Sequence, residues 1–193
     1  PFWDKTTMAD TLVTANERST AIQFLDGVDR LIGSLCKSVI MATGLALLFA
    51  IIIGVIARYV IDVGGVDWAE ELPKQLYSWF IMAGVVLALQ SGNHIAVDLI
   101  YNFLNAPAKR ILISLTNLLI CGAYIYLFFT ALEVADIAAA ERNPMLGTPN
   151  SLPFYALAIG SILTAVGALS ISIRVFLLGA DARPQGAAEE SVV

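Results

Sequence analysis

This chain of 193 residues contains a single histidine and two cysteines, so it has few of the side chains that build metal centres and disulfide frameworks. One histidine excludes any site that needs two imidazole ligands, including a haem held by two histidines. Cys36 precedes the first long apolar stretch and Cys121 lies in the middle of the third, so we interpret both as small apolar residues. The sequence shows no nucleophile–base pair and no phosphate-binding loop, so we predict no enzyme activity and no bound cofactor or metal.

Charge is also scarce, because only 14% of the residues are charged whereas 58% are hydrophobic. A soluble domain of this length could not bury so much apolar surface in one core. Four stretches carry no formal charge, and each reaches the length of about 20 residues that a helix needs to cross a bilayer. They are residues 38–57, 75–97, 111–132 and 143–173. We therefore predict an all-α integral membrane protein with four transmembrane helices.

The basic residues predict the orientation of these helices. Eight of the 11 Lys and Arg residues lie on the side that holds both termini, and the other side has only Arg58, Lys74 and Arg142. The positive-inside tendency then places both termini in the cytoplasm. The outer side carries seven acidic residues against three basic ones. We interpret them as solvated loops, with a docking rim for an external partner as the alternative.

The chain divides into a polar N-terminal segment, a membrane domain and a polar tail, at residues 1–23, 24–178 and 179–193. We expect both polar segments to be loosely ordered or disordered. Within the membrane domain the predicted spans are about 38–60, 68–91, 111–132 and 152–178.

Two further stretches have an apolar and a polar helical face, which is typical of amphipathic helices that lie in the membrane interface. In residues 24–36 the apolar face includes Val28 and Leu35, and the polar positions are Asp26, Asp29, Arg30 and Ser34. The second stretch is 94–105, where His94, Asp98 and Asn102 share the polar face.

Small residues predict where helices approach each other closely. Gly84, Ala88 and Gly92 recur every four positions in the second span, and Ala156 and Gly160 do so in the fourth. Asn117 is the most prominent polar side chain near a span centre, and we interpret it as a hydrogen-bonding contact between helices. No Asp or Glu lies in the central part of a span, where a proton-coupled carrier usually needs one. By its own residues, then, the chain resembles a membrane scaffold more than a catalyst or a pore.

One constellation carries a specific resemblance. The sequence reads Arg58-Tyr59, then Trp68-Ala69-Glu70-Glu71-Leu72, then Trp79 and Gly84, then Gly92-Asn93-His94-Ile95-Ala96-Val97-Asp98. This order and spacing resemble the small membrane subunit of tripartite ATP-independent periplasmic (TRAP) transporters, the DctQ-like family, over about residues 24–178. Gln90-Ser91 departs from that pattern, since one or two basic residues are expected there.

The resemblance implies a small permease subunit that braces a large, multi-span membrane subunit. In that family the large subunit carries solute and sodium, and a periplasmic binding protein delivers the solute, typically an organic acid. The implied system is a secondary active sodium symporter of the inner membrane, with membrane lipids as further partners and no nucleic acid. Two alternatives stay open: a self-sufficient homo-oligomeric transporter or channel, and a membrane anchor for a redox enzyme.

The same constellation supplies the candidate structural or partner-contact residues: Arg58, Trp68, Glu70, Glu71, Trp79, Gly84, His94 and Asp98. Arg58 either pairs with a carboxylate at the start of the second span or extends to lipid headgroups. Glu70 and Glu71 either take part in that pairing or cap the helix. Trp68 suits the interfacial aromatic belt, whereas Trp79 lies deeper and suits packing against a partner helix.

His94 and Asp98 lie four residues apart, so they can touch on one helix face. Their pairing is either a solvated interfacial contact or, as the resemblance implies, a structural hydrogen bond. The latter would set the angle between the second span and the interfacial helix.

Overall fold

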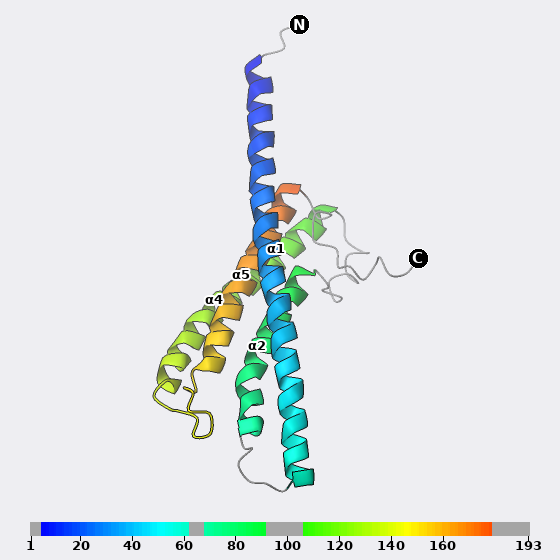
Figure 1. Ribbon diagram of the computed structural model, residues 1–193. Helices are drawn as coiled ribbons and strands as arrows, with labels where there is room; N and C mark the ends of the chain where they lie inside the picture. The colour runs from blue at the N-terminus through cyan, green and yellow to red at the C-terminus, as the bar shows by residue number, and fades with distance from the viewer. Residues whose placement is uncertain (1–4, 62–67, 92–105, 179–193) are drawn as a thin grey trace, which may run out of the picture.

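The computed structural model describes residues 5–61, 68–91 and 106–178 (Figure 1). In these residues the regular secondary structure is helical: α1 (Lys5–Ile56), the π-helical turn η1 (Ala57–Ile61), α2 (Trp68–Gln90), α4 (Ala106–Ala138) and α5 (Leu152–Leu178). This part of the chain contains four stretches long and apolar enough to cross a membrane: Leu25–Tyr59, Trp68–Gln90, Pro107–Ala138 and Leu152–Phe176. The prediction of an all-helical chain with four candidate transmembrane helices is confirmed.

The first helix corrects the predicted boundaries at the N-terminal end. The sequence predicted a loosely ordered polar segment, an interfacial helix at 24–36 and a separate span from residue 38. Instead α1 is one helix of 52 residues, about 78 Å long at the usual rise per residue. It contains no proline, and no turn residues separate 36 from 38, so nothing in the sequence stops the helix. Its N-terminal part extends beyond the ends of the other helices (Figure 1). The predicted interfacial helix 94–105 and the tail 179–193 lie outside the described residues.

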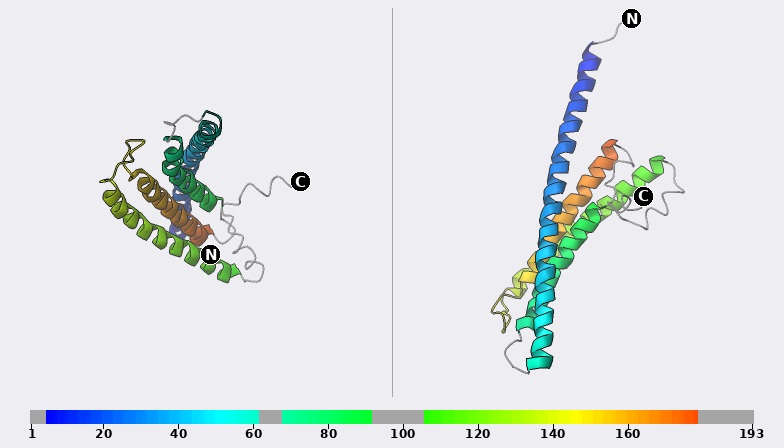
Figure 2. Two further views of the ribbon diagram at one scale, coloured as in Figure 1. Left: turned by 90° about the horizontal axis from the view of Figure 1, so that it is seen from below. Right: turned by 45° about the vertical axis from the view of Figure 1, so that its right-hand side comes forward.

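The four long helices form an open row in the order α4, α5, α2, α1. The helix α5 packs against both α4 and α2, and α2 packs against α1, whereas α1 touches α5 only slightly. The left view of Figure 2, seen from below, shows this arrangement. Burial follows it, since 56% of the most apolar window of α5 is buried and only 6% of that of α1. The helix α1 therefore has a long uncovered apolar flank.

Small residues bring α2 and α5 together. A Cβ added at Gly160 would lie 2.6 Å from Met82 Cβ, and one at Gly167 would lie 3.3 Å from Leu89 Cδ2. Ala156 is buried as well, so the close-packing face predicted on the fourth span is confirmed. Gly84 differs, because a Cβ there would meet nothing within 4 Å. The small-residue face of α2 around Gly84 is thus not used for packing by the described part of this chain.

The interior of the row holds the two cysteines and Asn117. Cys36 and Cys121 are free, buried and in different apolar clusters, as predicted. Asn117 is also buried, but its Nδ2 donates to the backbone oxygen of Ile113 in the same helix, at 2.9 Å. The interpretation of Asn117 as an interhelical contact is therefore wrong, because an amide on a helix can reach the carbonyl four residues back.

Candidate functional site: two polar junctions between the helices

Polar side chains join neighbouring helices at two levels, one near each end of the helices. The loop-end junction comprises Arg58, Glu70, Glu71, Lys74, Gln75, Asn143 and Thr148, where α2 contacts both η1 and the loop between α4 and α5. The α1–α5 junction comprises Asp26, Asp29, Gln90, Ser170 and Arg174 at the opposite end.

Glu71 connects α2 to the loop that precedes α5. Its Oε1 accepts from Lys74 Nζ at 2.5 Å, and its Oε2 accepts from Asn143 Nδ2 at 3.0 Å. Asn143 in turn accepts on Oδ1 from the backbone N–H groups of Met145 and Leu146, which is an Asx-type turn. Glu71 therefore contacts a loop in which Asn143 already fixes the backbone turn at residues 143–146.

A second contact joins the same two segments. Gln75 Nε2 donates to Thr148 Oγ1 at 2.8 Å, and Thr148 Oγ1 donates to Gln75 Oε1 at 3.0 Å. Gln75 is buried, so this reciprocal pair satisfies both ends of its amide away from solvent. The loop between α4 and α5 is thereby positioned against α2 by two neighbouring side chains one turn apart.

Arg58 lies close to Glu70, with Nη1 and Oε1 separated by 3.9 Å. The two side chains are 70% and 65% exposed, so the pair contributes about 1 kcal/mol or less to stability. The guanidinium also lies 6.0 Å from the centre of the Tyr59 ring. Of the two predicted partners, the structure thus brings Glu70 to Arg58 and directs Glu71 to Asn143.

The remaining candidate residues do not form a common site in the described part of the chain. Trp68 opens α2 and is 40% exposed, and Trp79 is half-buried farther along the same helix. Gly84 faces open space. His94 and Asp98 lie outside the described residues.

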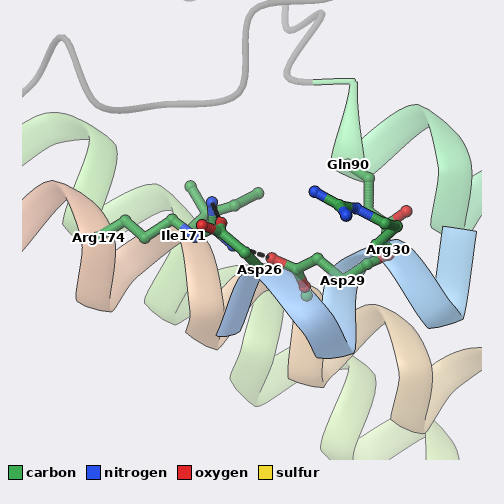
Figure 3. Close-up of a pocket in the computed structure, with 7 residues that line it drawn as sticks. Asp26, Asp29, Arg30, Gln90, Ile171 and Arg174 are labelled. Carbon is green, nitrogen blue, oxygen red and sulfur yellow. Dashed lines mark hydrogen bonds and ion pairs between the residues drawn. The ribbon is translucent and has the colours of Figure 1, made fainter. Parts of the chain in front are cut away.

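The α1–α5 junction centres on Arg174 of α5. Its Nη1 lies 2.7 Å from Asp26 Oδ1 and its Nη2 lies 2.6 Å from Asp29 Oδ2. Ser170 Oγ donates to the same Asp29 oxygen at 2.8 Å. Gln90 of α2 donates its Nε2 to the backbone oxygen of Asp29 at 3.1 Å. Three helices therefore meet at Asp29 (Figure 3).

Much of this junction is withdrawn from solvent. The Arg174 and Asp29 side chains are 13% and 20% exposed, and Asp26 is 46% exposed. Asp29 Oδ1 and Arg174 Nε are buried without a hydrogen-bond partner among the described residues. Such a pair adds little net stability over an apolar one, but the loss of one partner leaves a buried charge uncompensated. The junction therefore specifies which faces of α1 and α5 meet.

Sequence reasoning missed this junction. It assigned Asp26 and Asp29 to the solvated face of an interfacial helix, because Arg174 is 145 residues away from Asp29 in the chain. A signal was present, since two acids spaced like neighbouring turns of α1 and an arginine near the end of α5 are expected on the same membrane side.

Arg110 joins α4 to the end of α5. Its Nε donates to the backbone oxygen of Val175 at 3.0 Å, and its Nη2 donates to that of Phe176. These carbonyls belong to the last turns of α5, where backbone oxygens lack helical partners. Within the described ranges, no group of three or more His, Cys, Asp or Glu residues could hold a metal ion. The contacts of both junctions are those of helix positioning.

Comparison with known proteins identifies a family that this chain matches and several relatives. Residues 47–178 match the family model described as "Tripartite ATP-independent periplasmic transporters, DctQ component". An uncharacterised protein, y4mM of Sinorhizobium fredii, is 41% identical over 147 residues, which cover 76% of this chain and 27% of that protein. The C4-dicarboxylate TRAP transporter small permease protein DctQ of Rhodobacter capsulatus is 28% identical over 54% of this chain and 47% of its own. A putative TRAP transporter small permease protein of Haemophilus influenzae is 23% identical, over 55% and 64%. The chain thus matches less than two thirds of the length of each.

Proposed function

This chain belongs to the DctQ family of TRAP transporter components, and we propose that it is the small, non-catalytic membrane subunit that braces a large solute-translocating subunit. A family component with four candidate transmembrane helices is a multi-pass protein of the bacterial inner membrane. We further propose that both termini are cytoplasmic. The α1–α5 junction then lies on the cytoplasmic side and the loop-end junction on the periplasmic side.

The observation that carries this proposal is the open row with an uncovered α1. Along the α1 span, large apolar side chains are exposed at Met41, Leu45, Leu48, Phe49, Ile52 and Ile56. Lipid can cover such a flank without cost, and so can a second membrane protein. Because α1 packs along α2 and is joined to α5 through Asp26 and Asp29, it offers that second protein a long surface of fixed orientation. We propose that the large subunit packs on this flank.

The positions of the charged residues support the proposal that solute and sodium bind to the large subunit and not to this chain. The acids of the candidate spans lie near the span ends: Asp26, Asp29, Glu70, Glu71, Glu133 and Asp136. A chain without an ionisable group at mid-membrane lacks the usual element of proton- or ion-coupled transport. We propose that sodium and solute bind to the large subunit.

The proposed solute is an organic acid delivered by a periplasmic binding protein. The support is the name of the Rhodobacter capsulatus relative, a C4-dicarboxylate transporter component. The proposal extends to this chain only the chemical class, a carboxylate anion.

Affinity purification tests the assembly. Tagged chain is co-expressed with the large membrane protein and the solute receptor encoded nearest to its gene, and the purified material is analysed by size exclusion and mass spectrometry. We expect a stoichiometric complex with the large protein in detergent. Recovery of this chain alone, as a homo-oligomer, would favour the self-sufficient transporter or channel instead.

A further inference from the structure

Two basic side chains near the α1–α5 junction take no part in it. Arg30 and Lys37 are seven residues apart, so they lie on one face of α1, two turns from each other. Both are exposed, and the ion pairs found among the described residues include neither. Their charges are therefore available to a ligand.

A groove of about 480 Å³ lies between this face of α1 and the end of α2. Arg30, Gly33, Ser34 and Lys37 line it on α1, and Leu87 and Gln90 line it on α2. A smaller cavity of about 260 Å³ shares Arg30 and Gln90 with the groove and is bounded on its other side by Arg174 (Figure 3).

The acidic neighbour does not cancel the two cations. Asp29 also lines the groove, but its Oδ2 accepts from Arg174 and Ser170, and its Oδ1 is buried. Asp26 and Asp29 share the Arg174 guanidinium, so these three groups leave one negative charge against the two positive charges of Arg30 and Lys37. The groove therefore presents a net positive charge to a ligand at its mouth.

The position of the groove indicates the kind of anion. Lys37 is the last charged residue before the uncharged stretch 38–57, and the candidate span of α2 ends at Gln90. Both helices thus pass from apolar to polar surface at the level of the groove, which is the depth of lipid headgroups. Basic pockets between membrane helices bind the headgroups of anionic lipids. Leu87 adds apolar surface on the membrane side, which suits the start of an acyl chain.

We propose that this groove binds an anionic phospholipid, with Arg30 and Lys37 contacting its phosphate. The planar guanidinium of Arg30 can donate two parallel hydrogen bonds to phosphate oxygens, and Lys37 supplies a second positive charge two turns along the helix. The Ser34 hydroxyl lies between them and can donate a further hydrogen bond. Gly33 leaves room for Gln90, since a Cβ there would lie 2.9 Å from its Oε1. The proposal does not depend on the transport role.

Native mass spectrometry of the full chain in detergent tests it, with phosphatidylglycerol, phosphatidylcholine and inorganic phosphate as the three probes. We expect one tightly bound phosphatidylglycerol and at least about fivefold weaker phosphatidylcholine binding. The double variant Arg30→Gln/Lys37→Gln is expected to bind phosphatidylglycerol about 25-fold more weakly, since each basic residue near an anionic surface contributes about fivefold. Lys109→Gln, which removes one cation on α4 outside the groove, should bind as the unmodified chain does.

A second variant separates loss of binding from loss of folding. Ser34 is exposed on the groove face, so Ser34→Leu fills the groove and leaves every charge in place. We expect it to weaken phosphatidylglycerol binding while the helical circular dichroism stays unchanged. Equal binding of both phospholipids, or undiminished binding by the double variant, would overturn the proposal. Displacement of phosphatidylglycerol by an equal concentration of inorganic phosphate would show a small-anion site and overturn it as well.

Discussion

Arg174 is the side chain on which the α1–α5 junction depends. Arg174→Gln removes the charge that compensates Asp29, a carboxylate only 20% exposed. A broken, mostly buried pair costs about 3–5 kcal/mol, so we expect a clear drop in the thermal unfolding midpoint in detergent. Arg142→Gln is the matched control, since Arg142 is exposed and outside the ion pairs of the described residues. The double variant Arg174→Gln/Asp29→Asn should recover much of the loss. An Arg174→Gln variant as stable as Arg142→Gln would contradict this account of the junction.

Arg58 is expected to act differently, because its pair with Glu70 is exposed. Arg58→Ala should leave the stability of the isolated chain within about 1 kcal/mol, since surface pairs contribute little. We expect the variant instead to retain less of the large subunit through co-purification and washing. An undiminished complex would argue against a role for Arg58 in assembly.

Single residues also show what the sequence could and could not predict. Arg58 lies near Glu70 because only a short link joins the two adjacent spans, so this contact could be predicted from the local sequence. The contact of Arg174 with Asp29 depends on how α1 crosses α5, and no periodicity within one helix contains that information. Asn117 was misjudged for a related reason, because a buried amide can bond either within its own helix or across to another.

At the scale of elements, the α2–α5 contact depends on the absence of a side chain at Gly160. Gly160→Ala places a Cβ 2.6 Å from Met82 Cβ, so the helices must separate or shift. Overpacking of this kind costs about 1–3 kcal/mol, and we expect a lower unfolding midpoint. Gly84→Ala is the control on the facing helix, because nothing lies within 4 Å of the added Cβ. It should be neutral or stabilise by up to about 1 kcal/mol. Equal effects of the two variants would refute the assigned packing.

The continuity of α1 is a second element-scale prediction. Spin labels at Gly27 and Leu45, both exposed, are separated by 18 residues in a single helix. At the usual rise their backbone positions lie about 27 Å apart. With Cys36 and Cys121 replaced by alanine, pulsed electron resonance in lipid nanodiscs should give a narrow distribution near that value. A markedly shorter distance would restore the break between an interfacial helix and a separate span.

The spans themselves were predictable, since uncharged stretches of sufficient length are local features of the sequence. The division near residue 37 was not, because the amphipathic pattern of 24–36 fits a helix lying in the interface as well as the start of a long spanning one. The pairing of Asp26 and Asp29 with Arg174 decides between the two in the structure.

At the scale of the whole molecule, the order α4, α5, α2, α1 could not be read from the sequence. All four helices have apolar faces broad enough for lipid, so hydropathy does not say which faces meet. The arrangement depends on small residues such as Gly160 and on the two polar junctions. The outcome is a row in which α5 is the most buried helix and the outer helix α1 is largely uncovered. This shape is the basis for proposing a lateral brace.

Uptake of the radiolabelled organic acid that the neighbouring receptor binds, measured in proteoliposomes under an inward sodium gradient, tests the central claim most directly. We expect uptake when this chain, the large subunit and the loaded receptor are all present, and a loss of at least about tenfold when this chain is omitted. Vesicles that contain this chain alone should take up no more than empty vesicles. Accumulation of the anion by the chain alone would contradict the account, because a brace without a mid-membrane charge cannot move it.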